Sequence, residues 1–375
     1  MAFRAVIAGI GQTAFGRLPG RDTLALNAEA CRKALADAGI ERGLVDGLMC
    51  KVPTSRVEMM YGQKLAEALA LQPKVGGVWD QGGASSNSMV SLAAMMIEQG
   101  QCEVVLISLA DNPKSGTRQA YEKGWGEDAV FGWFSVAAGY AMLARRHMIE
   151  FGTTAEDLAA IAIACRRHGA ANPDAQLRKP LDLETYLAAP WVAEPLRRDD
   201  CCLISDGAAA VVVMAESKAR ELKIAQAVPV LGHGQGQTSW EVPQRSDLTH
   251  TMAGAAADTA YRMSGLGPKD MDVAQLYDCF TITVLMTLEA YGFCKPGQGA
   301  GFVRGGNLEL GGGLPINTAG GLLAETGMPG MQLITEAVRQ LRGQSVNQVK
   351  GAAKAIVSNQ GGIMHTHSTL ILGAP

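Results

Sequence analysis

Two glycines followed by small and hydroxyl-bearing residues give the stretch WDQGGASSNSMVSLAAMMIEQGQ, residues 79–101, the layout of a catalytic loop. Apolar side chains then recur in helical rhythm, so the loop at Gly82 and Gly83 is predicted to lead into the N-terminus of a helix. Ser85 and Ser86 are the candidate nucleophiles. A serine hydroxyl attacks only when a base removes its proton, and no such base is visible in the sequence. We therefore expect both serines to shape and cap the helix N-terminus.

Two histidines, His365 and His367 in GGIMHTHSTLILG, carry the second candidate chemistry. Residues i and i+2 of a β-strand point to the same side, so both rings face a site or both face away from it. Histidine is the natural general acid–base group near pH 7. The same spacing occurs in metal sites, but no cluster of carboxylates accompanies it, so no metal is predicted. The open alternative is that backbone groups satisfy both rings.

The composition excludes several classes of function. The chain has 375 residues, of which 47% are hydrophobic and 18% charged, and this suits a large buried interior. The net charge is −3, without the basic stripe that nucleic acids or anionic membranes require. No apolar run is long enough to cross a bilayer, and the N-terminus lacks the pattern of a signal peptide. The eight cysteines form no CxxC pair, so reduced thiols in a soluble cytoplasmic protein are expected.

Short apolar runs alternate with longer helical patterns along the chain, and this alternation predicts α/β layers. The runs that indicate strands are 5–11, 104–110, 209–215, 228–234 and 355–358. A helix is predicted over 22–38, where Gly39 closes it. Another is predicted from Thr154, where TAED has the form of a capping box.

An internal repeat divides the chain into two halves. Gly82-Gly83 leads into a helix, a stop at Gly100 and the strand EVVLISL, and Gly320-Gly321 leads into a helix, a stop at Gly343 and the strand AAKAIVS. The repeat predicts two copies of one topology, with the Gly-Gly loops related by approximate symmetry and converging on one site. The predicted boundaries are 1–220 for the N-terminal half, with a loop insertion at about 112–200, and 226–375 for the C-terminal half.

Three segments together resemble the thiolase superfamily, particularly its lipid-transfer-protein branch of thiolase-like enzymes. They are FGRLPGRDTLALNAEACRKALADAGI near the start, DDCCLISDGAAAVVVMAESKARELKI at 199–224 and INTAGGLLAETGMPGM at 316–331. The resemblance spans nearly the whole chain. It implies an α/β thiolase fold of two similar βαβαβαββ halves in a five-layered αβαβα arrangement, with a homodimer as the usual smallest assembly. This expectation agrees with the internal repeat.

The catalytic positions depart from the family pattern. The position of the nucleophilic cysteine matches Ala84, with Ser85 beside it, and the position of the second cysteine matches Ser358. The family histidine falls at 327–328, and the Asn-Glu motif is replaced by YDCF at 277–280. The resemblance therefore implies thiolase architecture without the Cys/His/Cys groups of acyl transfer.

Retro-aldol cleavage of a β-hydroxyacyl-CoA needs only donors for the thioester enolate, a base for the hydroxyl and an acid for the enolate carbon. By resemblance, the N–H of Ala84 and an N–H from the turn at Gln360 and Gly361 form the oxyanion hole. Steroid side-chain aldolases of this branch are similar in YDCFTITVLMTLEAYGFC, residues 277–294. This similarity assigns an acid–base role to Tyr277.

A second tyrosine implicated in those aldolases would fall near Gly327, where no tyrosine stands. Either another group substitutes, with His365 and His367 as the candidates, or the reaction differs. Asp278 is expected to cap a helix or to hydrogen-bond to a catalytic group, and a role as the base stays open. The predicted enzyme is a carbon–carbon lyase of steroid or lipid catabolism, with a coenzyme A thioester as substrate and no tightly bound cofactor.

Two other interpretations stay open. An acyltransferase would use Ser85, or Cys279 beside Tyr277, as an unconventional nucleophile. Alternatively, the chain is a subunit that is inactive without its partner, because members of this branch often work beside a small OB-fold protein with a zinc ribbon that helps to bind CoA.

Overall fold

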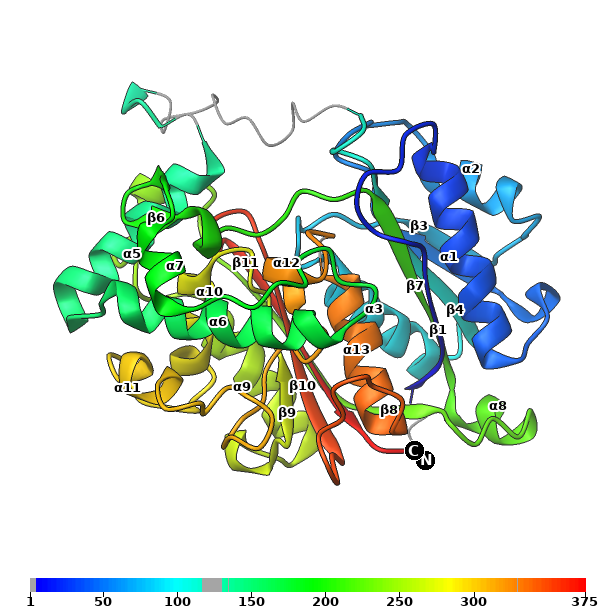
Figure 1. Cartoon of the computed structure of the whole chain (residues 1–375). Coiled ribbons are helices and arrows are strands. Elements are labelled where there is room, and N and C mark those ends of the chain that lie inside the picture. Colours follow the sequence, from blue (N-terminus) through cyan, green and yellow to red (C-terminus); the bar gives the residue numbers. More distant parts are fainter. Residues whose placement is uncertain (1–4, 117–129, 134, 329) are drawn as a thin grey trace.

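Both halves of the chain contribute to one nine-stranded sheet in the computed structural model, which describes residues 5–116, 130–133, 135–328 and 330–375 (Figure 1). Its strand order is β3-β2-β4-β7-β1-β8-β11-β10-β9. These strands are β1 (Ala5–Gln12), β2 (Gly47–Cys50), β3 (Val75–Val78), β4 (Val104–Asp111), β7 (Gly207–Ala215), β8 (Val228–Gln237), β9 (Val273–Gln275), β10 (Lys354–Gly361) and β11 (Thr366–Gly373). A separate hairpin pairs β5 (Trp191–Ala193) with β6 (Leu196–Arg197). All five runs that the sequence indicates as strands are strands in the structure.

Helices separate most of these strands along the chain. They are α1 (Thr23–Ala38), α2 (Tyr61–Ala68), α3 (Ser85–Glu98), α5 (Val136–Phe151), α6 (Ala155–Ala171), α7 (Leu183–Ala188), α8 (Glu216–Glu221), α9 (Ala253–Ser264), α10 (Thr281–Ala290), α11 (Gly299–Val303), α12 (Gly321–Ala324) and α13 (Met331–Arg342). Short 3-10 turns are η1 (Arg42–Leu44), η3 (Arg198–Asp200), η4 (Val242–Gln244) and η5 (Pro268–Asp270). Across the part of the chain that the structure describes, no helix combines the length and apolar character needed to cross a membrane.

The two helix ends predicted from local sequence signals are confirmed. The Asp22 carboxylate accepts a hydrogen bond from the Ala25 N–H (2.7 Å) at the start of α1, and Gly39 ends that helix with φ of 67°. Thr154 and Asp157 form the capping box at the start of α6. Each signal satisfies backbone groups that would otherwise lack a partner at a helix end.

The same strand pattern occurs twice in the sheet. In the first half, β2 is parallel to β4, which is followed by antiparallel β7 and β1. In the second half, β9 is parallel to β10, which is followed by antiparallel β11 and β8. The halves meet where β1 and β8 pair antiparallel. The internal repeat of the sequence is therefore a repeat of topology.

The two halves enclose a central layer of helices. α3 contacts β4 and β7 of the first half together with β8, β10 and β11 of the second, and α13 also contacts strands of both halves. α1 packs on the outer side against β1, β4 and β7, and α9 packs against β8 and β11 on the other side (Figure 1). The two halves of the nine-stranded sheet thus lie on either side of the central helices, with further helices outside each half, and this order confirms the predicted five-layered fold.

Close approach of the two halves explains the small residues at the start of α3. Ala84, Ser85, Ser86, Asn87 and Ser88 are all completely buried, although four of them are polar. β4 and β7 are buried along their whole length, as expected for strands covered on both faces. The N-terminus of α3 is thus held between the two halves of the sheet.

The prediction that Gly320-Gly321 is the counterpart of Gly82-Gly83 is wrong. α3 precedes β4 and α13 precedes β10, so α13 is the counterpart of α3. α13 begins after Gly330, which has φ of 84°. Gly320-Gly321 instead opens the separate short helix α12, with φ of 108° and 61° at the two glycines. Glycine permits left-handed conformations at both places, so the pattern alone does not tell which glycine starts the long helix.

Candidate active site

Tyr277 and Asp278 follow β9, and each side chain reaches one of the two Gly-Gly loops. A Cβ atom at Gly83 would lie 2.2 Å from the Tyr277 hydroxyl oxygen and 2.3 Å from the Gln360 carbonyl oxygen. A Cβ atom at Gly321 would lie 2.3 Å from Oδ2 of Asp278. These spacings leave no room for a side chain at either glycine. Both loops therefore meet at this dipeptide.

Backbone hydrogen bonds hold Tyr277 in place. Its N–H donates to Ser358 Oγ (3.2 Å), and its carbonyl accepts from Thr283 Oγ1 (2.7 Å). Tyr277 is buried, with 8% of its surface exposed, and its hydroxyl lies against the Gly83 backbone. Ser358, which matches the second family cysteine, thus positions the tyrosine through its backbone.

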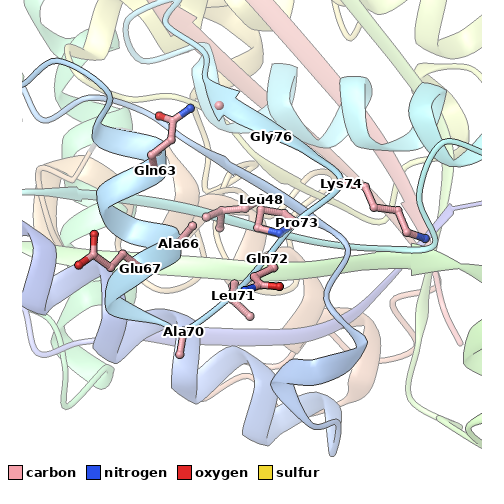
Figure 2. A pocket seen from close by; sticks show the side chains of 12 residues that line it. Leu48, Gln63, Ala66, Glu67, Ala70, Leu71, Gln72, Pro73, Lys74 and Gly76 are labelled. Atoms are coloured by element: carbon pink, nitrogen blue, oxygen red, sulfur yellow. The ribbon is translucent and has the colours of Figure 1, made fainter.

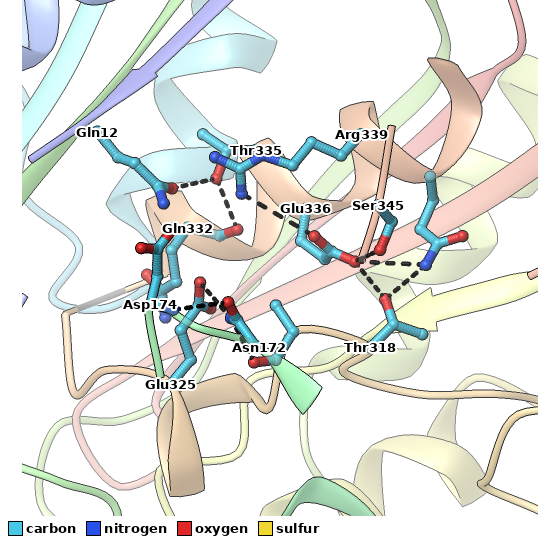
Figure 3. A network of polar contacts seen from close by, with 12 residues as sticks. Gln12, Asn172, Asp174, Thr318, Glu325, Gln332, Thr335, Glu336, Arg339 and Ser345 are labelled. Carbon is cyan, nitrogen blue, oxygen red and sulfur yellow. Dashed lines mark hydrogen bonds and ion pairs between the residues drawn. The ribbon is translucent and has the colours of Figure 1, made fainter. Parts of the chain in front are cut away.

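A buried polar network fixes the end of β9, two residues before Tyr277. Gln275 Nε2 donates to Thr318 Oγ1 (3.0 Å), and Thr318 Oγ1 donates to the Glu336 carboxylate (2.6 Å). Ser345 Oγ donates to the same Glu336 oxygen (2.6 Å), as Figure 3 shows. β9, the segment before α12 and the helix α13 are therefore tied together behind the tyrosine.

Asp278 caps α12. Its carboxylate accepts from the N–H groups of Leu322 (2.7 Å) and Leu323 (3.2 Å), and Cys165 Sγ lies 3.5 Å from Oδ2. Burial raises the Asp278 pKa to about 6, although these N–H donors act in the opposite direction. The geometry agrees with the predicted helix cap and gives the carboxylate a positioning role.

The hydroxyl of Ser85 makes its hydrogen bonds within the first loop. Ser85 Oγ accepts from the Gln81 N–H (2.8 Å) and donates to the Gly82 carbonyl (2.7 Å). Ser85 and Ser86 are both completely buried. These contacts stabilise the turn that presents Gly83, as expected for residues that shape a helix N-terminus.

Ala84 does not offer the backbone donor that the resemblance implies. Its N–H donates to the Gln81 carbonyl (3.2 Å), and the residue is completely buried. Its carbonyl accepts from Ser88 Oγ (3.0 Å) and from Ser368 Oγ (2.7 Å). Because Ala84 is bonded within its own turn and to β11, the expected oxyanion donor is occupied in this structure.

The end of β10 packs directly on the first loop. A Cβ atom at Gly361 would lie 2.0 Å from the Gln81 carbonyl oxygen. Gln360 Nε2 lies 2.8 Å from the Tyr140 hydroxyl and 2.9 Å from Cys279 Sγ. Tyr140 is a site residue that the sequence analysis missed, because no motif marks its position in α5.

His365 lies in the turn that precedes β11, whereas His367 lies on β11 itself. Thr366, between them, donates through Oγ1 to the Gln81 carbonyl (2.9 Å). His367 pairs with Gln360 in the β10–β11 register. Burial lowers the His367 pKa to about 3, with Arg245 adding to the effect, so the ring is neutral at pH 7.

His365 accepts a hydrogen bond from the Ile363 N–H at Nδ1 (2.6 Å), which leaves that nitrogen unprotonated. Its ring also stacks on Trp240. Among the described residues, no group of three or more His, Cys, Asp or Glu side chains has the arrangement of a metal site.

Cys279 is a poor nucleophile in this environment. Burial and the neighbouring Cys202 raise the pKa of its thiol well above the usual value. A thiol rather than a thiolate is therefore present near neutral pH, and the thiolate is the reactive form.

A cationic cavity of about 640 Å³ opens beside the site. It is lined by Lys114, Arg166, Leu177, Val192, Arg198, Asp199, Cys201, Cys202, Leu203, Ile204 and Leu323. The Cys202 N–H donates to the Cys279 carbonyl (2.9 Å), and the Leu323 N–H bonds to Asp278. Its wall is thus continuous with the YDCF segment.

A second cavity of about 650 Å³ lies between α2 and β3, as Figure 2 shows. Among its lining residues, Glu67 and Lys74 are the ionisable ones, and they stand at opposite sides of the view. No candidate residue of the active site lines this cavity.

Family models match both halves of the chain. The model described as "Thiolase, N-terminal domain" matches residues 5–217, and the model described as "Thiolase C-terminal domain-like" matches residues 234–374. The chain belongs to the thiolase superfamily. Within this superfamily, its similarity is to the lipid-transfer-protein branch, as the relatives show.

Two curated relatives of this thiolase-like chain cleave carbon–carbon bonds. A steroid side-chain-cleaving aldolase of Thermomonospora curvata is 38% identical over 99% of this chain and 98% of that protein. A 17-hydroxy-3-oxo-4-pregnene-20-carboxyl-CoA lyase of Mycobacterium tuberculosis is 38% identical over 99% of both chains. The solved structure titled "Ltp2-ChsH2(DUF35) aldolase" superposes with a TM-score of 0.90 at 38% identity, over 99% of this chain and 98% of that one. This full-length similarity supports a carbon–carbon lyase of the aldolase type.

Proposed function

We propose that this thiolase-like enzyme performs retro-aldol cleavage of a β-hydroxyacyl-CoA with a bulky acyl group, such as a steroid side chain, and releases a short acyl-CoA. The observation that carries the proposal is the Tyr277 hydroxyl against Gly83, where the first loop and the end of β10 meet. A phenol there replaces the thiolase cysteine chemistry with a group for proton transfer. The two aldolase relatives support the same reaction type.

In the proposed reaction, Tyr277 acts as the acid–base group that takes the proton of the β-hydroxyl. The oxygen then forms a carbonyl, the Cα–Cβ bond breaks, and its electron pair passes to the thioester as an enolate. A proton returned to Cα completes the short acyl-CoA. His365 and His367 are the candidate relays for that proton, whereas Asp278 fixes the loop at α12.

Backbone groups at the end of β10, at Gln360 and Gly361, are proposed to stabilise the enolate oxygen. Oriented N–H donors in a site that excludes water stabilise developing negative charge strongly. This segment is fixed for this purpose, because the Met364 N–H donates to Gln360 Oε1 (3.1 Å) and Gly361 packs on Gln81. Ala84 and Ser85 then support the loop rather than contact the substrate.

We place the coenzyme A portion of the substrate in the cavity that Lys114, Arg166 and Arg198 line. Three cations suit the phosphates of CoA. Asp199 bonds to Arg166 (2.8 Å) and to Arg198 (2.9 Å), which orients both guanidinium groups at the cavity. The cavity wall leads to Cys279 and Asp278, so a thioester can reach the site from it.

A homodimer and a small OB-fold partner with a zinc ribbon complete the proposal. The support for a partner is the neighbouring structure, whose title joins Ltp2 to ChsH2(DUF35). All eight cysteines are free thiols, which agrees with a reducing compartment such as the cytoplasm.

The direct test is a panel of β-hydroxyacyl-CoA thioesters assayed for release of acetyl-CoA or propionyl-CoA, with and without the partner protein. We expect cleavage of the members with bulky acyl groups and no covalent intermediate in the mass spectrum of the intact chain. Accumulation of an acyl-enzyme, with no carbon–carbon cleavage of any member, would support acyl transfer instead.

A further inference from the structure

Trp240 is a large aromatic side chain that stays exposed beside the candidate site. Its exposed fraction is 63%, yet its indole ring stacks on the buried imidazole of His365 at 5.0 Å between centroids and 25° between planes. One face of the indole is therefore held by the protein. The other face of the indole offers a fixed, flat apolar surface on which a ligand can pack.

The residues around Trp240 connect it to the reacting groups. The Thr238 N–H donates to the His365 carbonyl (2.7 Å), two residues before the tryptophan. A Cβ atom at Gly362 would lie 2.2 Å from His365 Nδ1, and one at Gly82 would lie 3.3 Å from the Gly362 nitrogen. Contacts therefore run without a gap from Trp240 to the loop that touches Tyr277.

The segment that carries Trp240 is anchored on its far side as well. Val242 is buried, with 3% of its surface exposed, and Arg245 Nη2 donates to the Ile363 carbonyl (2.7 Å). Trp191 is exposed too, but the Arg197 guanidinium covers its ring at 3.7 Å. Unlike Trp191, Trp240 stacks on a residue of the turn at the candidate site.

We propose that Trp240 is the apolar wall on which the bulky acyl group of the substrate packs, and that it determines the preference of the enzyme for large acyl groups. This inference rests on the proposed retro-aldol function and adds a residue for specificity. A flat indole suits a flat fused-ring system, because the two surfaces remove apolar area from water together. His365 is then the support that orients the indole.

Two variants and two substrates test the proposal. Trp240→Ala and Trp240→Phe are compared using a β-hydroxyacyl-CoA with a fused-ring acyl group and one with a short linear acyl group. We expect Trp240→Ala to raise KM for the fused-ring substrate about tenfold to a hundredfold, with the short substrate changed by less than about twofold. Trp240→Phe should retain most of the preference, because it keeps an aromatic surface.

An equal loss for both substrates, or no change for either, would overturn the proposal. A changed sedimentation coefficient of Trp240→Ala would also overturn it, since the tryptophan would then belong to a subunit contact. Binding of a free fused-ring carboxylic acid, followed by tryptophan fluorescence with Trp240→Phe as the control, supplies a readout without turnover. If the wild-type chain cleaves neither substrate but its Trp240 fluorescence still changes on adding the acid, the proposed reaction is wrong and the apolar wall is retained. If the fluorescence does not change, the apolar wall is contradicted.

Discussion

The Tyr277 hydroxyl oxygen would lie 2.2 Å from a Cβ atom at Gly83, so the phenol contacts the backbone of the first Gly-Gly loop directly. Thiolase-like architecture is thus retained while the reactive group changes. The loop that would carry a nucleophilic cysteine now forms a wall for a tyrosine from the segment after β9. Proton transfer, rather than covalent attack, is the chemistry that this arrangement supports.

We predict that Gly83→Ala abolishes most of the activity. The new methyl group would meet the Tyr277 hydroxyl oxygen at 2.2 Å and the Gln360 carbonyl oxygen at 2.3 Å, so both groups must be displaced relative to the loop. A displacement of about 1 Å in a catalytic group can cost about a hundredfold in rate. Gly43→Ala is the matched control, because a Cβ atom at Gly43 meets nothing within 4 Å. Wild-type kcat/KM in Gly83→Ala would show that the contact is irrelevant to catalysis.

Ser85→Ala should lower stability and spare activity. The substitution removes an oxygen that makes two hydrogen bonds inside the loop, at a cost of about 1–3 kcal/mol in the free energy of unfolding. The rate per folded molecule should fall by less than about tenfold, because the serine has no activating base. Ser86→Ala should likewise spare activity. A loss of about a thousandfold in either folded variant would point to covalent acyl transfer.

The cationic cavity predicts an effect on KM rather than on kcat. Lys114→Ala and Arg198→Ala should each raise KM for a CoA thioester about fivefold to tenfold and leave kcat within about twofold. Each variant removes a contact to the phosphates that is equally strong in the bound substrate and in the transition state. Lys350→Ala, on an exposed turn away from the cavity lining, is the control. Unchanged KM in both variants would remove coenzyme A from this cavity.

Acidification should destabilise the protein through His367. Its pKa is lowered from 6.5 to about 3 by folding, so the unfolded chain binds more protons than the folded chain between these values. The free energy of unfolding therefore falls as pH decreases through this window, by at most about 1.4 kcal/mol per pH unit from this group. His367→Gln should show a smaller decrease in chemical denaturation series at pH 7 and pH 5. Identical pH dependence in both proteins would contradict a buried neutral imidazole.

Local signals predicted the fold well because they act within single elements. The αL glycine at Gly39 and the capping box at Thr154 each mark a helix end, and the repeated strand pattern follows from the spacing of apolar runs. Asp278 was expected to cap a helix, but the helix that it caps is α12, 44 positions along the chain, and not α10, which follows it directly and has no side-chain cap.

Other features depend on which distant elements pack together, and periodicity does not report this. Tyr140 and Gln360 are hydrogen-bonded across 220 positions, with no motif at either residue. The occupied N–H of Ala84 depends on the turn formed by its own loop. The exposed face of Trp240 was equally invisible, because an aromatic residue in a loop has no periodic pattern that shows its exposure.

The most direct test of the account is the rate of carbon–carbon cleavage in Tyr277→Phe, measured with a bulky β-hydroxyacyl-CoA in single turnover. The substitution keeps the ring and its backbone anchors at Ser358 and Thr283 and removes the hydroxyl oxygen beside Gly83. We expect the rate to fall about a hundredfold to ten-thousandfold, as for loss of a general acid–base group, with little change in the midpoint of thermal unfolding. An unaltered rate in the folded variant would contradict the central role of Tyr277 and leave His365 and His367 as the candidates for proton transfer.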